Sequence, residues 1–323
     1  MDTKNNISRP VAAKLQVKNL TFTLSVIGVV IGALLFPTYF TQWGSFNLKS
    51  LIVPLLMLIM FGMGTTMSIK DFAGVLKMPK AIFIGLICQF SIMPIIGFTL
   101  VSIASLPTEI AAGVILVGSS PSGLSSNVMS FISKSNVALS ITLTACATFI
   151  APFATPLLMK FLASSYVPVD ALTMFWSITR IVLLPVIGGL IFNYFLYERF
   201  NFFAKLMPAL SMAGITFIIG IITAFGRDSL LSIGFLLVGI VILHNSLGYT
   251  FGYWLSILFG MDKKSARTIA FEVGLQNSGL ASGIAVEMGK LATMGLAPAL
   301  FSIFQNISGS ILASFWRKDV KEL

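Results

Sequence analysis

A single carboxylate lies where a hydrophobic chain rarely carries one. Glu272 occurs in the run Ala270–Gly279, AFEVGLQNSG, inside a long apolar stretch, whereas the other ten Asp and Glu residues fall in terminal tails or between apolar segments. A carboxylate at membrane depth costs about 2.5 kcal/mol or more, so it persists where a cation or hydrogen-bond donors meet it. Gln276, Asn277 and Ser278 follow and add oxygen atoms, which suit a hard cation such as sodium. These residue types predict a cation site.

A second polar run interrupts another apolar stretch. In Gly118–Asn127, GSSPSGLSSN, Leu124 is the only large apolar side chain. Pro121 removes a backbone donor and glycines flank it, so we expect a helix break near Pro121–Gly123. A broken helix leaves free N–H groups, which attract anions, and free carbonyls, which attract cations. Such a break predicts a place for a cation and an organic anion side by side.

The two polar runs resemble each other. Gly123–Asn127 reads GLSSN and Gly274–Ser278 reads GLQNS, 151 residues further along the chain. A matched pair of interrupted spans, one in each half, is typical of a transport site at the membrane midplane. Small polar residues also join membrane helices without any ligand. The matching run and the lone carboxylate favour the transport site over that alternative.

The composition dictates the elements that must position these runs. The chain is 56% hydrophobic and 10% charged, which excludes a soluble domain and predicts an all-α polytopic membrane protein. The apolar runs are about twenty residues long without strict alternation, so they predict helices rather than a barrel. We expect ten spans, at residues 21–40, 50–69, 81–102, 110–133, 135–159, 171–197, 206–226, 229–258, 268–286 and 291–316.

Basic residues give these spans a direction. With the N-terminus inside, sixteen of the 21 Lys and Arg residues fall on the inner side and four on the outer side, while Arg180 lies within a span. This bias predicts a multi-pass protein of the inner (plasma) membrane with both termini in the cytoplasm. It also explains the net charge of +10 without nucleic acid. Two sets of five spans enter from opposite sides, which predicts an inverted repeat.

The motifs resemble those of the bile acid:sodium symporter family, over residues 20–316. Five stretches carry the likeness: Phe61–Gly64, Pro121–Met129, Asn136–Ser140, Glu272–Leu280 and Asn306–Ser310. The resemblance implies a panel domain of residues 21–69 and 171–226 and a core domain of residues 81–159 and 229–316. Cytoplasmic tails, residues 1–20 and 317–323, would flank them. It also implies that the fourth and ninth spans cross at their breaks.

The resemblance further implies two sodium sites that share Glu272. The first would use Ser126, Asn127, Ser140, Thr144 and Glu272. The second would use Gln89, Glu272, Gln276 and the carbonyls of Val273 and Leu275. The substrate would contact Asn277, Asn306, Ser125, Leu124 and Ser122. No cofactor is implied beyond sodium as a co-substrate, and the expected partners are the lipid bilayer, two sodium ions and a small organic anion.

The chain departs from the family pattern at the fourth-span break. It has Pro121-Ser122-Gly123 where the family often has Pro-Gly-Gly, and Leu124 replaces a small polar residue. The family handles bile acids in animals and, in bacteria, bile acids or small hydroxy-carboxylates related to pantothenate, such as pantoate. The sequence does not choose between these substrates.

Alternatives follow from the same residues. The leading hypothesis is sodium-coupled symport by alternating access, and two sodium ions with one monoanion would carry a net charge of +1. In the second hypothesis Glu272 carries a proton instead. Taken singly, Ser140 and Thr144 are typical back-bonding hydroxyls, and Gln89 or His244 with Asn245 typical interhelical contacts. An enzyme is disfavoured because no nucleophile–base pair or metal triad is visible. Arg180 receives no role.

Overall fold

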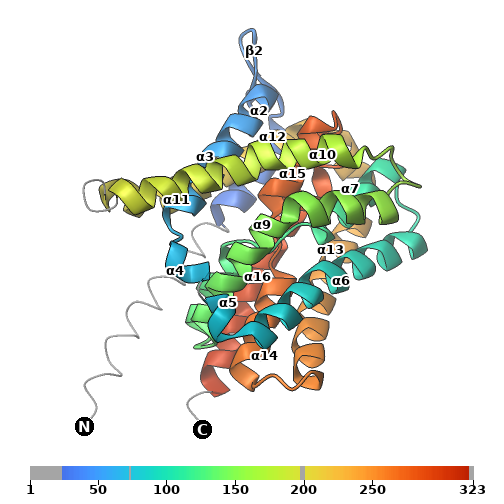
Figure 1. Ribbon diagram of the computed structural model, residues 1–323. Coiled ribbons are helices and arrows are strands. Elements are labelled where there is room, and N and C mark those ends of the chain that lie inside the picture. The colour runs from blue at the N-terminus through green and yellow to red at the C-terminus, as the bar shows by residue number, and fades with distance from the viewer. Residues whose placement is uncertain (1–23, 73, 197–200, 320–323) are drawn as a thin grey trace.

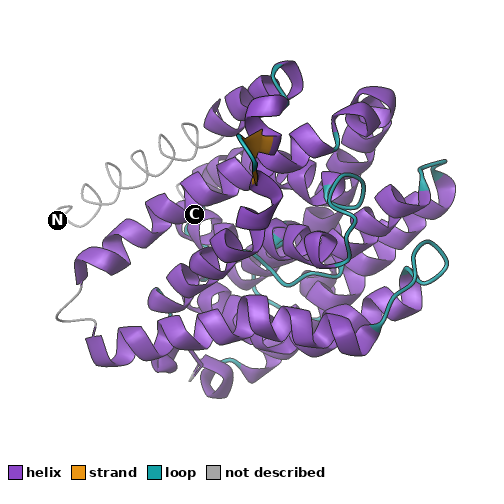
Figure 2. Ribbon diagram, turned by 90° about the horizontal axis from the view of Figure 1, so that it is seen from above, coloured by secondary structure: helices purple, strands orange, loops and turns teal. Residues whose placement is uncertain are grey.

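The computed structural model describes residues 24–72, 74–196 and 201–319, and in these ranges it is almost entirely helical. The only strands among the described residues are β1 (Gln42–Trp43) and β2 (Phe46–Asn47), which form the small hairpin projecting at the top of Figure 1. Seen along a perpendicular direction, helices fill the molecule (Figure 2). The helices are α2 Thr38–Thr41, η1 Leu48–Leu51, α3 Ile52–Thr65, α4 Ile69–Phe72, α5 Gly74–Lys77, α6 Pro79–Ile103, α7 Thr108–Gly118, α8 Ser125–Ile132, α9 Val137–Leu162, α10 Ala171–Ile178, η2 Thr179–Leu183, α11 Leu184–Leu196, α12 Asn201–Phe225, α13 Arg227–Leu258, α14 Lys263–Gly274, α15 Ser278–Glu287 and α16 Leu296–Asp319.

Length and hydropathy identify membrane-spanning helices. Helices pair all their backbone groups internally, which lipid requires. In Figure 1, α10 and α11 are continuous, because the π-helical turn η2 joins them. Six helices in the described ranges are long and apolar enough to cross a membrane: Leu48–Thr65, Pro79–Ile103, Val137–Leu162, Ala171–Phe195, Arg227–Leu258 and Leu296–Lys318. The chain is therefore a polytopic membrane protein, as predicted.

Other apolar helices occupy further expected spans. Thr108–Gly118 is apolar but shorter, and the apolar segments Leu24–Leu35 and Ala209–Phe225 lie in the spans expected at 21–40 and 206–226, the second as the C-terminal part of the 25-residue helix α12. The spans expected at 110–133 and 268–286 are each divided into two helices, so neither is identified by length. The total of ten spans therefore stays a prediction. The predicted tail 1–20 and residues 320–323 lie outside the described ranges.

Two groups of helices pack within themselves. α3 packs against α11 and α12, while α13 packs against α6, α14 and α16. At the crossing of α3 and α11, a Cβ on Gly64 would lie 2.1 Å from the carbonyl oxygen of Val186, so only glycine lets the two backbones approach. The first group belongs to the residues expected for the panel and the second to those expected for the core. The division into two domains remains a prediction.

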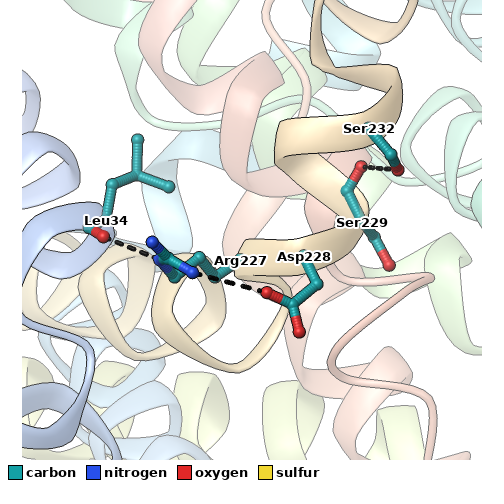
Figure 3. A network of polar contacts seen from close by, with 5 residues as sticks. All are labelled: Leu34, Arg227, Asp228, Ser229 and Ser232. Atoms are coloured by element: carbon teal, nitrogen blue, oxygen red, sulfur yellow. Dashed lines mark hydrogen bonds and ion pairs between the residues drawn. The ribbon is translucent and has the colours of Figure 1, made fainter.

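Two arginines bond across the boundary between these groups. Arg180, in η2, pairs with Glu287 at the end of α15 at 2.5 Å, so it joins one expected domain to the other. Figure 3 shows Arg227 at the start of α13, between the Leu34 carbonyl and the Asp228 carboxylate. Its Nε donates to Leu34 O at 2.8 Å and its Nη1 lies 3.5 Å from Asp228. Arg227 thereby satisfies a carbonyl at the end of helix Leu24–Leu35.

Candidate cation and substrate site at the helix crossing

The first break lies between α7 and α8. α7 ends at Gly118 and α8 begins at Ser125, so the interruption surrounds the predicted point at Pro121–Gly123. Side chains from other helices hold carbonyls that the broken helix leaves free. Thr155 Oγ1 donates to Ser119 O at 2.7 Å, and Gln89 Nε2 donates to Ser120 O at 3.0 Å. The buried polar backbone is thus satisfied inside the protein, as the bilayer requires.

The second break lies between α14 and α15 and is shorter. α14 ends at Gly274 and α15 begins at Ser278. Asn245 Nδ2 donates to Gly274 O at 2.7 Å. Gln305 pairs with both backbone groups of Gln276, accepting from its N–H at 2.8 Å and donating to its carbonyl at 3.1 Å. Side-chain amides therefore replace the helical hydrogen bonds lost at this break.

The two breaks bond to each other. Gly123 N donates to Leu275 O and Asn277 N donates to Pro121 O, both at 2.8 Å. These bonds surround an antiparallel bridge between Ser122 and Gln276. Backbone polar groups from both halves of the chain are consequently paired at one point. The four half-helices α7, α8, α14 and α15 all start or end there.

Four oxygen-bearing side chains gather around Glu272, which is 1% exposed. Ser140 Oγ lies 2.5 Å from Glu272 Oε1, and Thr144 Oγ1 lies 2.9 Å from Glu272 Oε2. Both hydroxyls also contact Asn127 Oδ1, at 2.8 and 3.3 Å, and Thr144 contacts Ser126 Oγ at 3.2 Å. The structure therefore brings together all five residues predicted for the first sodium site.

This cluster contains more acceptor contacts than protons. Ser140 and Thr144 each carry one hydroxyl proton, yet each faces both Glu272 and Asn127 Oδ1. In the described ranges, no basic side chain forms an ion pair with Glu272. Buried oxygen atoms that lack protons repel one another unless a positive charge lies among them. The arrangement can therefore hold a small cation or an added proton.

Part of the second predicted set also lies together. Gln89 Nε2 lies 3.0 Å from Gln276 Oε1, and Gln276 Nε2 donates to Val273 O at 2.6 Å. Gln89 Oε1 is buried and accepts no hydrogen bond from the described residues. Leu275 O faces Gly123 N, and the hydrogen bonds of Glu272 involve the first set. The structure thus brings together Gln89, Gln276 and Val273 O, with Leu275 O turned toward the other break.

A cavity of about 220 Å³ adjoins the crossing. Four of the five predicted substrate residues line it: Leu124, Ser125, Asn277 and Asn306. Ser122 does not, because it is fully buried in the bridge with Gln276. The cavity reaches Thr66 at the end of α3, and its other walls come from α8, α12, α15 and α16. None of its described lining residues is charged, so polar contacts come from amides, hydroxyls and helix ends.

Sequence reasoning missed residues that hold the breaks. Thr155 and Gln305 were not singled out, although Gln305 directly precedes the motif residue Asn306. Asn245 was interpreted as a structural contact together with His244. The structure gives them separate partners: His244 Nε2 contacts Met93 O at 2.9 Å, while Asn245 holds Gly274 O. A polar residue inside an apolar span was the only available signal.

Comparison with known proteins identifies a family of transporters. The Sodium Bile acid symporter family matches residues 53–233. The uncharacterized sodium-dependent transporter YocS of Bacillus subtilis is 41% identical over 303 residues, which cover 94% of this chain and 92% of that protein. The probable sodium/metabolite cotransporter BASS1 of Arabidopsis thaliana, described as chloroplastic, is 37% identical over 82% of this chain and 66% of its own length. The family and these relatives are transporters and not enzymes.

Proposed function

Because the chain belongs to the sodium bile acid symporter family, we propose that it is a secondary transporter that couples sodium entry to uptake of a small organic anion. The observation that carries this proposal is the buried Glu272 among Ser126, Asn127, Ser140 and Thr144. A sodium ion there neutralises the carboxylate and is coordinated by the oxygen atoms that receive no hydroxyl proton. Transport rather than catalysis follows from the family.

A second sodium ion is proposed beside the first. The free Oε1 of Gln89 and the nearby Oε1 of Gln276 and carbonyl of Val273 are oxygen donors of the same hard type. Rotation of the Glu272 carboxyl would add one of its oxygen atoms to this second set, so that the same carboxylate would coordinate both ions. Two sodium ions with one monoanion move a net charge of +1, so uptake is electrogenic.

The proposed substrate is a small hydroxy-carboxylate, such as pantoate, rather than a bile acid. The cavity of about 220 Å³ is smaller than the roughly 300–1,000 Å³ typical of drug-sized ligands. Asn277 and Asn306 supply amides for hydroxyl groups. α8 and α15 both begin at its wall, at Ser125 and Ser278, and helix N-termini attract a carboxylate. This explains recognition of an anion without a basic side chain.

The proposed architecture has ten spans in two inverted repeats, with the panel and core bounds given above. The contacts at the breaks support it. The third span of each half sends an amide to a break carbonyl, Gln89 in one and Asn245 in the other. The fifth span of each half also bonds the break of its own half, through Thr155 at the first break and Gln305 at the second. Equivalent positions thus do equivalent work, as expected of related halves.

The proposed orientation places both termini in the cytoplasm of a plasma-membrane protein, following the basic-residue bias. The cavity, which extends to Thr66, then faces the cytoplasm. The Arg180–Glu287 pair joins panel and core on the outer side. Alternating access requires this outer contact to open when the inner cavity closes.

Uptake into proteoliposomes tests the proposal. With the pH gradient held constant, external sodium is replaced by potassium, and uptake of labelled pantoate and taurocholate is measured for the wild type and Glu272→Ala. We expect wild-type uptake to require sodium and to increase with an inside-negative membrane potential. We expect Glu272→Ala to lose this uptake. Wild-type uptake that survives potassium but collapses with the pH gradient would favour the second candidate, proton coupling, in which a proton on Glu272 supplies the donor that the cluster lacks. Sodium-stimulated uptake by Glu272→Ala would contradict both.

A further inference from the structure

Gln305 on α16 has an unusual set of partners. It is 4% exposed, and its amide forms three hydrogen bonds to the second break. Its Oε1 accepts from Gln276 N at 2.8 Å, and its Nε2 donates to Gln276 O at 3.1 Å and to Ser278 Oγ at 3.2 Å. A side chain that bonds both backbone groups of one residue fixes the two peptide planes that flank it.

The antiparallel bridge explains why Gln276 needs such a partner. The bonds between the breaks use the neighbours of the bridged pair, Gly123 N to Leu275 O and Asn277 N to Pro121 O. In this kind of pair, the backbone groups of the opposed residues point away from each other. Gln276 N–H and C=O therefore point away from the first break and meet Gln305.

Gln276 belongs to the second group of oxygen donors. Its side-chain amide lies between Gln89 Nε2 and Val273 O, at 3.0 and 2.6 Å. The direction of that side chain depends on the backbone that Gln305 holds. Gln305 also lines the cavity, next to Asn306. One side chain thus connects the cavity wall with the backbone of a proposed sodium ligand.

We propose that Gln305 is a positioning residue, which orients Gln276 for sodium binding and thereby links the ion site to the substrate cavity. The inference rests on the proposed sodium-coupled function. It assigns Gln305 to the protein backbone rather than to the substrate, because its amide oxygen and nitrogen are both engaged by the break. Loss of the amide leaves Gln276 N–H unpaired in a buried place and removes one of the two hydrogen bonds to Gln276 O, which keeps only that from Ser278 N, so the break must rearrange.

The test is a sodium titration of purified, full-length protein without substrate. Thermal stability is followed while sodium chloride replaces potassium chloride at constant ionic strength, for the wild type, Gln305→Leu and the control Ser310→Ala. Ser310 lies on the same helix, where its hydroxyl faces Met129 Sδ and touches neither break. Loss of the amide is expected to raise the sodium concentration for half-maximal stabilisation about tenfold or more, with no change in Ser310→Ala.

The outcomes separate the two ideas. A wild-type sodium midpoint in Gln305→Leu, with only the KM for substrate raised, would overturn the positioning role and leave sodium coupling intact. A wild type that sodium does not stabilise at all would instead contradict the proposed function. If Gln305→Leu does not fold, Gln305→Asn carries the same test, because it keeps the amide oxygen and nitrogen but is one methylene too short to reach both backbone atoms. Its sodium midpoint is expected to rise likewise, and an unchanged midpoint would overturn the proposal.

Discussion

The two helix breaks solve one problem in different ways. The first, between Gly118 and Ser125, contains Pro121 and is neutral. The second, between Gly274 and Ser278, contains no proline and follows Glu272 by less than a turn. Proline removes a backbone donor that would otherwise need a partner. The second break keeps all its donors, and one of them, the N–H of Gln276, is satisfied by Gln305 on another helix.

The side chains that support each break reflect this difference. Thr155 gives one hydrogen bond to the first break, whereas Gln305 gives three to the second. The break next to the charged residue Glu272 is thus the one at which a side chain from another helix forms more hydrogen bonds. The additional hydrogen bonds from another helix and the charged residue Glu272 thus occur at the same break.

The largest expected contrast concerns the proposed sodium ligands. Glu272→Gln keeps the size of the side chain but removes the only charge at the crossing, so sodium-stimulated uptake is expected to fall at least about 100-fold. Asn127→Ala removes one neutral oxygen beside the first break and is expected to raise the sodium concentration for half-maximal uptake about tenfold. Uptake into proteoliposomes over a sodium series measures both. If Glu272→Gln lost no more sodium-stimulated uptake than Asn127→Ala, the proposed difference between the two breaks would be wrong.

Packing should also differ between the breaks. A Cβ on Gly274 would lie 2.2 Å from Tyr249 Cδ1, whereas one on Gly123 would lie 3.1 Å from Gln276 O. The Tyr249 hydroxyl is held at 3.2 Å by Gln305 O, so its ring cannot move freely. Gly274→Ala is expected to destabilise the protein by about 1–3 kcal/mol, and Gly123→Ala by less. Thermal unfolding in detergent without sodium compares them, and a milder effect at Gly274 would reverse the prediction.

The one hydrogen bond that Thr155 gives to the first break predicts a smaller effect. Thr155→Val keeps the shape of the side chain but leaves Ser119 O without its 2.7 Å hydrogen bond. The expected loss of stability is about 1 kcal/mol. Thr148→Val is the matched control, because Thr148 donates to Thr144 O within its own helix and supports neither break. Similar unfolding midpoints for the two variants would show that Thr155 does not support the break.

The smallest expected effect concerns a contact that joins the two broken spans. Glu109, at the start of α7, bonds Lys290 and Thr293 beyond α15. The hydrogen bonds from Lys290 and then Thr293 lower the pKa of the Glu109 carboxyl. Because the folded pKa is lowered, the contact stabilises the protein above the ordinary value of 4.5, and this stabilisation is lost as the pH falls through the lowered value.

Glu109→Gln should therefore reduce stability at pH 7 by less than about 1 kcal/mol, since the pair is partly exposed. The difference from the wild type is expected to shrink as the pH falls below 4.5. Unfolding midpoints of both proteins across that pH range provide the check. A difference that grew on acidification would have the wrong sign for this contact.

The positions of both breaks could be predicted from the sequence, because proline, glycine and a lone carboxylate are local signals. The members of the first oxygen cluster were predicted only through the resemblance to the family. Proline alone would have misled, since Pro94, Pro152 and Pro156 lie inside the continuous helices α6 and α9. The supports Asn245 and Gln305 could not be found, because only folding brings them to residues about 30 positions away. The burial of Ser122 likewise follows from pairing across the two halves, which no local pattern encodes.

The mutual bonding of the breaks has a consequence for biosynthesis. The partner of Gly123 N is Leu275 O, about 150 residues later in the chain. At about 5–20 residues per second, translation delivers that carbonyl roughly 8 to 30 seconds after the amide. During this interval, the first half of the chain carries backbone groups whose hydrogen-bond partners have not yet been synthesised. The hydrogen bonds that join the two breaks can therefore form only after both halves of the chain have been synthesised.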